Sequence, residues 1–172
     1  MARNLLISIV VLLLAMFAAG FGLRLFMDRA AEDRLRAGED AAIQALREPL
    51  RANAFLACPP GYCALAEAVP SPVFPVDADR LYRLFARLIA AEPRIVTLLA
   101  EPQARRIVVI QRSAVFRFPD VVTAEFVALG PGRSGIALYS RARYGRADFG
   151  VNRRRVTAWL ARLQRLVGGE VQ

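Results

Sequence analysis

The residues best able to do chemistry lie in one arginine-rich segment near the end of the chain, which reads SRARYGRADFGVNRRRV over residues 140–156. Gly145 and Gly150 permit the positive φ angles of a tight loop. Asp148 and Asn152 could accept hydrogen bonds from the free amides at a helix start. Amides of this kind beside guanidinium groups can hold a phosphate, a carboxylate or a lipid headgroup. The segment therefore predicts a candidate anion site, whose members are Arg143, Asp148, Asn152, Arg153, Arg154 and Arg155.

Two other interpretations of these residues stay open. Arginine at a helix start is unfavourable with the helix dipole, so the arginines could pair instead with Asp120, Glu125 or Asp148 and form a structural clasp between a strand and the helix. Alternatively, Asp120 and Asp148 could act as general acid and base in a hydrolytic or similar enzyme. We favour a non-enzymatic role and assign no catalytic residue. The positions expected to serve structure are Arg117, Asp120, Gly145 and Gly150.

The composition removes the commonest catalytic chemistries. The 172 residues include no histidine, and all 24 basic residues are arginine. The chain therefore has no Ser-His-Asp or Cys-His nucleophile, no HExxH zinc site and no Walker phosphate loop. Two cysteines cannot supply four zinc ligands, so we expect no metal. We also expect no cofactor. The net charge of +9 permits nucleic-acid binding, but no interleaved aromatic platform supports it, and we expect no nucleic-acid partner.

An uncharged run from Leu5 to Leu23 predicts a membrane anchor over residues 1–27. At about 1.5 Å per residue, this run spans about 28 Å, close to the hydrocarbon thickness of a bilayer. Its length favours an anchor over a cleaved signal peptide, whose apolar region usually has about 7–15 residues. The sequence thus predicts a single-pass inner-membrane protein, with an anionic lipid or an envelope protein as its candidate partner.

The side of the membrane is left open by two conflicting signals. Arg24, Arg29, Arg34 and Arg36 follow the run whereas Arg3 precedes it, which favours a cytoplasmic domain. Cys58 and Cys63 flank a Pro-Pro-Gly-Tyr turn that could bring their sulfurs within bonding distance. A disulfide would imply an oxidising compartment, here the periplasm. Of the two compartments, cytoplasm and periplasm, we expect the periplasm for this domain.

The elements that position the arginine-rich segment are predicted from apolar periodicity and from turn residues. We expect a helical stalk over 28–57, through which copies of the chain could associate, and a Pro-rich connector over 58–76. An α+β domain follows over 77–168, and a tail over 169–172. Asp77 or Asp79 should cap its first helix, over 77–91; Asn152 should cap its last, which Gly168 and Gly169 should end. The strands expected between them are 95–100, 106–112, 115–129 and 136–144.

This order predicts an antiparallel sheet of about four strands with both helices on one face, which leaves the other face free for solvent or a ligand. In the third strand, one face should carry Phe116, Phe118, Val122, Ala124 and Phe126. Pro119 should mark a bend or an edge. If the following hairpin centres near Arg133, Glu125 lies opposite Arg141 in a favourable cross-strand pair.

The arginine-rich segment resembles the G-x-x-D-x-G-V-N-R-x-R-V signature of a bacterial and plastid family known as domain of unknown function 1499. The stretch FRFPDVVTAEF, residues 116–126, resembles that family's F-x-D-D-V-E-F-like strand. The chain departs from the family at Val121, where a second acid is common, and over residues 61–65, where N-C-V-S-S is usual. The resemblance covers roughly residues 58–167. It implies a membrane or envelope location and no particular mechanism.

Overall fold

The computed structural model describes residues 7–23 and 42–170, and the chain divides into two compact units, residues 1–39 and 40–172. In the first unit, residues 7–23 form a helix whose large apolar side chains, among them Leu14 and Phe17, are exposed. Among the described residues, no helix is long and apolar enough to cross a membrane.

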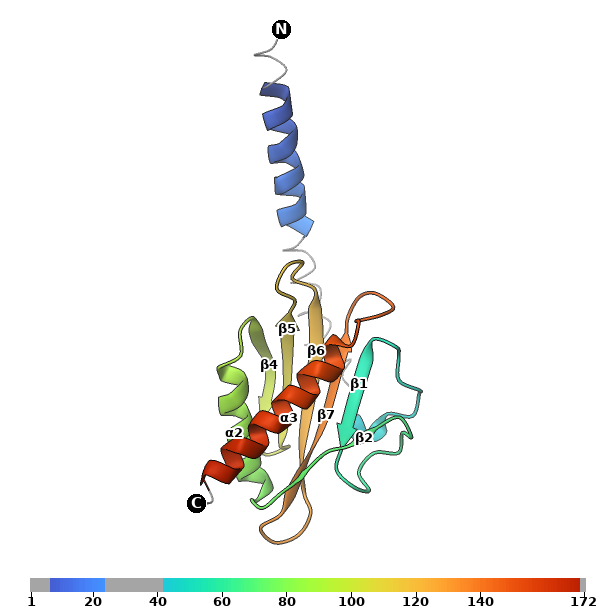
Figure 1. Ribbon diagram of the computed structural model, residues 1–172, viewed down its shortest axis with the longest axis vertical. Helices are drawn as coiled ribbons and strands as arrows, with labels where there is room; N and C mark the ends of the chain where they lie inside the picture. The colour runs from blue at the N-terminus through green and yellow to red at the C-terminus, as the bar shows by residue number, and fades with distance from the viewer. Residues whose placement is uncertain (1–6, 24–41, 171–172) are drawn as a thin grey trace. The chain divides into compact units, whose positions relative to one another are not determined.

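The second unit is built on one seven-stranded sheet (Figure 1). The strands along it run in the order β2-β1-β7-β6-β5-β4, and β3 pairs separately with β7. Their bounds are β1 Ala54–Cys58, β2 Val69–Pro70, β3 Val73–Phe74, β4 Ile95–Glu101, β5 Arg106–Arg112, β6 Pro119–Ala128 and β7 Ser134–Ala142. All pairings are antiparallel except that of β1 with β2. The fold is therefore α+β.

Helices α2 (Ala78–Ala90) and α3 (Val151–Glu170) pack on the same face of this sheet, as Figure 1 shows. Asp77 caps α2, as predicted, by accepting a hydrogen bond from the amide of Arg80. Phe85 of α2 contacts the rings of Phe126 on β6 and Trp159 on α3, with centroids 5.5 and 5.8 Å away. One aromatic cluster thus joins both helices to the sheet.

The opposite face of the sheet is also buried, so the expectation of a free face was wrong. Leu56, Cys58 and Ala137 pack there against Ile43, which belongs to the short 3-10 helix η1 (Ile43–Ala45). Farther along the same face, Val108, Ile110 and Val121 are buried as well. A strand that is buried on both faces of a sheet has a continuous apolar sequence, without the alternation of apolar and polar residues that marks a half-exposed strand.

The expected four strands become seven because β1, β2 and β3 lie in segments predicted as stalk and connector. The stalk prediction was wrong over 42–57, where η1 and β1 replace the expected helix; residues 28–41 lie outside the described part of the chain. The apolar sequence of β1 has no polar alternation, and short apolar runs of this kind do not distinguish strand from helix. Its strand geometry depends on pairing with β7, more than 80 residues away.

Two details of the β6–β7 hairpin also differ from expectation. Ala128 pairs with Ser134, so the turn centres near Pro131, and Glu125 lies opposite Ala137 instead of Arg141. On its other side, Glu125 pairs in register with Arg106 of β5. Pro119 opens β6, which leaves Phe116 and Phe118 in the preceding loop, exposed, rather than in the core.

Candidate functional site

Arg155 is the centre of a hydrogen-bonded network under the first turns of α3. Its Nη2 atom lies 2.6 Å from Oδ2 of Asp120 on β6, and its Nε donates to Gln111 Oε1 on β5 at 2.5 Å. Its Nη1 donates to Ser140 Oγ of β7 at 2.8 Å and to Asn152 Oδ1 at 2.5 Å. One side chain of α3 therefore contacts three adjacent strands, which makes its position depend on the whole sheet.

Asn152 extends this network to Asn53, the residue before β1. Ser140 Oγ donates to Asn152 Oδ1 at 2.6 Å, and Asn152 Nδ2 donates to the carbonyl oxygen of Asn53 at 2.9 Å. Asn53 Nδ2 in turn donates to the carbonyl oxygen of Gly145 at 2.8 Å. Asn152 was predicted to cap α3, but it lies inside the helix and is buried.

Asp148 is the residue that caps α3. Its Oδ1 accepts the amide of Gly150 at 3.0 Å and its Oδ2 accepts the amide of Asn152 at 2.7 Å. Gly150 has φ +77°, the left-handed conformation that the predicted tight loop requires. The amides at the helix start, which the sequence assigned to an anion, are thus bonded to a carboxylate of the chain itself. At the other end, Gly168 and Gly169 lie within α3 and do not end it.

The two aspartates differ in their electrostatics. Burial raises the pKa of Asp120, and the Arg155 guanidinium lowers it by less than burial raises it. Partial burial also acts to raise the pKa of Asp148, but the hydrogen bonds from Asn152 and Gly150 outweigh this effect and leave that pKa below its ordinary value. Asp148 is therefore held as a carboxylate, whereas Asp120 is protonated more readily than an exposed aspartate.

The remaining arginines of the predicted anion site point to different partners. The Arg153 guanidinium carbon lies 4.9 Å from the centre of the Phe55 ring, a cation–π contact with β1. Arg154 Nη1 donates to the carbonyl oxygen of Phe149 at 3.0 Å. Arg143 leads out of β7, and its amide donates to the carbonyl oxygen of Pro119 at 3.2 Å. Arg117 lies in the loop before β6 with φ +60°. The side chains of Arg153 and Arg154 therefore have separate partners within the chain.

A pocket of about 430 Å³ lies on the other flank of α3, between the first turns of this helix, the end of β5 and the residues just before β4. Its basic wall consists of Arg94, Arg112, Arg154, Arg155 and Arg162. The one carboxylate in its lining is Glu92, which forms an ion pair with Arg162. Trp159 and Ala158 add apolar surface. This combination suits an anion that also carries an apolar or planar part.

Several residues of the network and of the pocket escaped prediction from the sequence. Asn53 fell in the predicted stalk, and Gln111 lies near the end of a strand that was predicted from its isoleucines and valines. Arg94 lies between α2 and β4, and Arg162 lies in α3 beyond the arginine-rich segment. The sequence held a signal for Arg94 alone, because it follows Pro93, where a helix was predicted to end.

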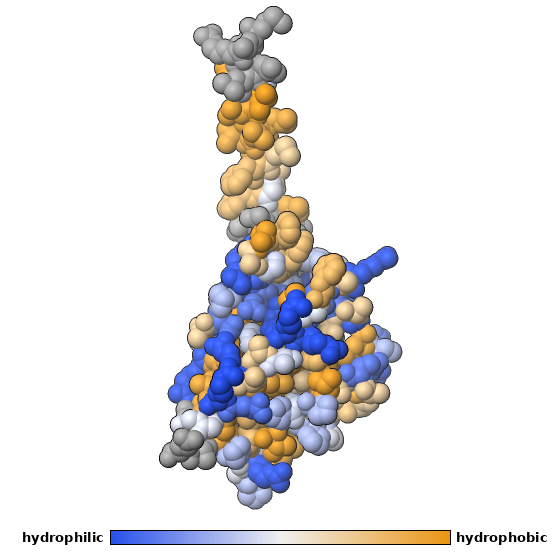
Figure 2. All heavy atoms as spheres, viewed as in Figure 1, coloured by the Kyte–Doolittle hydropathy of each residue, from blue (hydrophilic) through white to orange (hydrophobic). Residues whose placement is uncertain are grey.

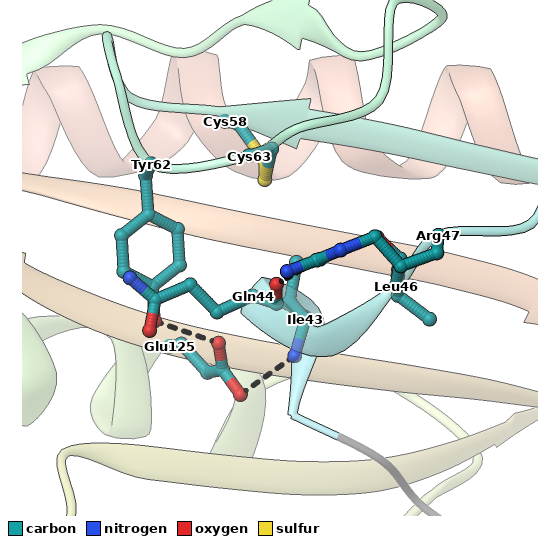
Figure 3. Close-up of a disulfide and its surroundings, with 8 residues drawn as sticks. All are labelled: Ile43, Gln44, Leu46, Arg47, Cys58, Tyr62, Cys63 and Glu125. Carbon is teal, nitrogen blue, oxygen red and sulfur yellow. Dashed lines mark hydrogen bonds between the residues drawn. A yellow bond between two sulfur atoms is a disulfide. The ribbon is translucent and has the colours of Figure 1, made fainter.

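The cysteine pair belongs to a second polar cluster, on the face away from the helices (Figure 3). Cys58 and Cys63 form a disulfide with their Cα atoms 6.1 Å apart. Tyr62, inside that loop, donates its hydroxyl to Glu125 Oε2 at 2.9 Å, and the amide of Ile43 donates to Glu125 Oε1 at 3.0 Å. Arg106 Nε lies 3.9 Å from the same Oε1 atom. Burial, together with this bond to Glu125, raises the pKa of Tyr62.

Sequence comparison places the chain in a family. The model described as "Protein of unknown function (DUF1499)" matches residues 65–163, more than half of the chain, and the protein belongs to this family as the arginine-rich segment predicted. No curated protein sequence matches the chain.

Among solved structures, a similar one is described as the "Crystal structure of the di-domain ARO/CYC BexL from the BE-7585A biosynthetic pathway". It is 18% identical in sequence, with a TM-score of 0.44, and the match covers 56% of this chain and 44% of that one. The chain thus spans less than half the length of that protein.

Proposed function

We propose that this protein is a non-enzymatic envelope protein, held at the inner membrane by its N-terminal apolar run, whose second unit binds an anionic ligand in the arginine-lined pocket beside α3. The anchor is supported by the uncharged sequence from Leu5 to Leu23, which is longer than the helix described over 7–23, and by the exposed apolar side chains of that helix. The disulfide between Cys58 and Cys63 supports a periplasmic location. Association of copies through the segment predicted as a stalk, 28–57, stays a prediction, although residues 42–57 do not form the expected helix.

The observation that carries the binding function is the charge of the pocket. Five arginines line it, and its single carboxylate, Glu92, is paired with Arg162. A guanidinium has five N–H donors, and the bond from Arg154 Nη1 to Phe149 uses one of them. The bond from Arg94 Nε to the carbonyl oxygen of Arg112 uses one of Arg94's. Arg94 and Arg154 are therefore the residues we assign to the ligand, which should carry a phosphate or a carboxylate.

We place the anion in the pocket and not at the helix start, where the sequence predicted it. There, Asp148 already accepts the amides of Gly150 and Asn152, so a second anion would meet a carboxylate instead of open donors. Arg154 and Arg155 of the predicted site line the pocket, and of these Arg155 is held by the network. We assign Arg155 to structure and Arg154 to binding.

Binding can be measured by calorimetry on the full chain in detergent micelles, with inorganic phosphate and with a short-chain phosphatidylglycerol as two separate probes. Arg94→Gln and Arg154→Gln should each weaken binding at least about tenfold, because each removes a charge-assisted hydrogen bond. Arg165→Gln is the matched control, since Arg165 is exposed on α3 but does not line the pocket. Binding of neither probe to the unmodified chain would refute the proposal.

The membrane side can be tested with a membrane-impermeant thiol reagent on intact cells. A periplasmic domain should label at Cys58 and Cys63 only after reduction and without lysis. Labelling that needs lysis but no reductant would place the domain in the cytoplasm and refute this part of the proposal.

The enzymatic alternative rests on Asp120, since a buried carboxyl with a raised pKa is a common feature of active sites. Against it, the Asp120 carboxylate bonds Arg155 and Asp148 caps a helix, so both candidate groups have structural partners. A hydrolytic role would require Asp148→Asn to abolish turnover of a model ester while the fold is kept. We expect no turnover from the unmodified chain.

A further inference from the structure

Two loops at one end of the sheet expose a group of large apolar side chains, which we call the aromatic rim. Residues 113–118, between β5 and β6, contribute Val115, Phe116 and Phe118; residues 143–150, between β7 and α3, contribute Tyr144 and Phe149. Figure 1 shows both loops at the same end of the second unit. Phe116 is 66% exposed and Phe149 is 90% exposed, which is far more than packing in a monomer explains.

The two loops are in contact, so the rim is one surface. The amide of Arg143 donates to the carbonyl oxygen of Pro119 at 3.2 Å, which joins the end of one loop to the start of the other. Ser113 of the first loop and Val151, just after the second, line the same pocket. The exposed rings therefore belong to neighbouring segments, next to the mouth of the arginine-lined pocket.

Both loops are held in defined conformations that present these rings. In the first loop, Ser113 and Phe118 exchange two hydrogen bonds of 2.9 and 3.0 Å, and the rings of Phe116 and Phe118 stack with centroids 5.8 Å apart. Arg117 between them has φ +60°, and Phe149 has φ +51°. Such values are uncommon for residues other than glycine, and strained backbone of this kind gathers at binding sites.

The charge around the rings is positive. Arg117, Arg143 and Arg146 belong to the two loops, and Arg154 follows in the first turn of α3. The carboxylate within these loops, Asp148, is bonded to the amides of the helix start. On the face that carries the helices, hydrophilic residues (blue) and hydrophobic residues (orange) lie side by side in Figure 2. Exposed phenylalanines among arginines complement a surface whose outer layer is negatively charged and whose inner layer is apolar.

We infer that the aromatic rim docks on the headgroup region of an anionic bilayer, with Phe116, Phe118 and Phe149 inserted between lipids and the arginines on their phosphates. Aromatic rings are favoured at this depth of a membrane, and cations near it are attracted by acidic lipids. This inference rests on the proposed function, because the anchor keeps the second unit at a bilayer. It also brings the pocket beside Arg154 to the lipid surface, so that a headgroup becomes the nearest anion.

Insertion can be measured as fluorescence quenching of the full chain reconstituted in vesicles that contain brominated lipids. The chain has one tryptophan, Trp159, which is buried and gives the baseline. Phe116→Trp and Phe149→Trp each add a reporter to the rim. Leu166→Trp is the matched control: Leu166 is an exposed apolar residue of α3, about 22 Å along the helix from Val151.

In vesicles with phosphatidylglycerol, we expect strong quenching at positions 116 and 149 and baseline quenching at 166. Adding Arg117→Gln and Arg146→Gln should lower the docking equilibrium roughly 30-fold, and high salt should act in the same direction. Quenching equal at all three positions, or at baseline in every one, overturns the inference. Sedimentation with vesicles measures attachment through the anchor, and calorimetry with phosphate measures binding in the pocket. A loss of attachment or of phosphate binding is therefore distinguished from a loss of docking by the aromatic rim.

Discussion

Arg155 Nη2 and Asp120 Oδ2 lie 2.6 Å apart, and the two side chains keep only 7% and 11% of their exposure. The pair joins α3 to the middle of the sheet. Removing one partner of a buried ion pair leaves the other charge without compensation, which is worse than removing both.

We therefore expect Arg155→Gln to lower the free energy of unfolding by about 3–5 kcal/mol. The double variant with Asp120→Asn should lose less than the sum of the two single losses. Urea denaturation of the full chain in micelles measures these values. Arg105→Gln, which breaks the exposed pair with Asp79, is the control and should change stability little. A small loss for Arg155→Gln would mean that the network does not hold α3.

Asp148 should make stability depend on acid pH. Because its pKa is lowered in the folded chain, its stabilising effect is fully present above its unfolded pKa and is lost as the pH falls through the folded pKa. Asp148→Ala should cost about 1 kcal/mol at pH 7, as for other helix caps. The difference between the melting temperatures of the unmodified chain and the variant, followed from pH 7 to pH 3, should shrink as the pH falls. A difference that stays constant over this range would contradict the assignment.

The bond between Tyr62 and Glu125 should stabilise the segment around the disulfide. Tyr62→Phe removes one donor from a buried carboxylate, which should cost about 1–3 kcal/mol. Tyr144→Phe makes the same chemical change at an exposed position and should have little effect. Thermal denaturation of both variants under oxidising conditions tests this comparison; equal melting temperatures would show that Glu125 is satisfied without Tyr62.

Two glycines should respond to alanine in opposite ways. A Cβ atom at Gly135 of β7 would lie 2.5 Å from Pro59 Cβ, so Gly135→Ala forces strand and loop apart and should cost about 1–3 kcal/mol. At Gly168 in α3, no atom lies within 4 Å of such a Cβ, and alanine there should add about 0.5–1 kcal/mol through helix propensity. Urea denaturation measures the free energy of unfolding of the two variants. If both substitutions raise it, Pro59 moves freely away from the new methyl group and the expectation for Gly135 is wrong.

Much of the second unit could be predicted because its signals are local. The helix over 78–90 follows from a capping aspartate and an apolar stripe, and β5 from a run of isoleucine and valine. The family was also readable, since the spacing of Gly145, Asp148 and Asn152 is contiguous in the chain. The strands from 54 to 74 could not be predicted, because short apolar pieces become strands only when a partner such as β7 is present.

The sequence by itself determined the chemistry that is possible: arginine without lysine or histidine, two cysteines five positions apart, an uncharged N-terminal run and a loop rich in glycine and arginine. Only the tertiary structure decided which arginine does what. Arg153, Arg154 and Arg155 are adjacent in the chain, yet a helix turns successive residues by about 100°. Arg153 therefore contacts Phe55, Arg154 lines the pocket, and Arg155 also lines the pocket but is bonded to Asp120. Those partners come from distant strands, whose register no local pattern specifies.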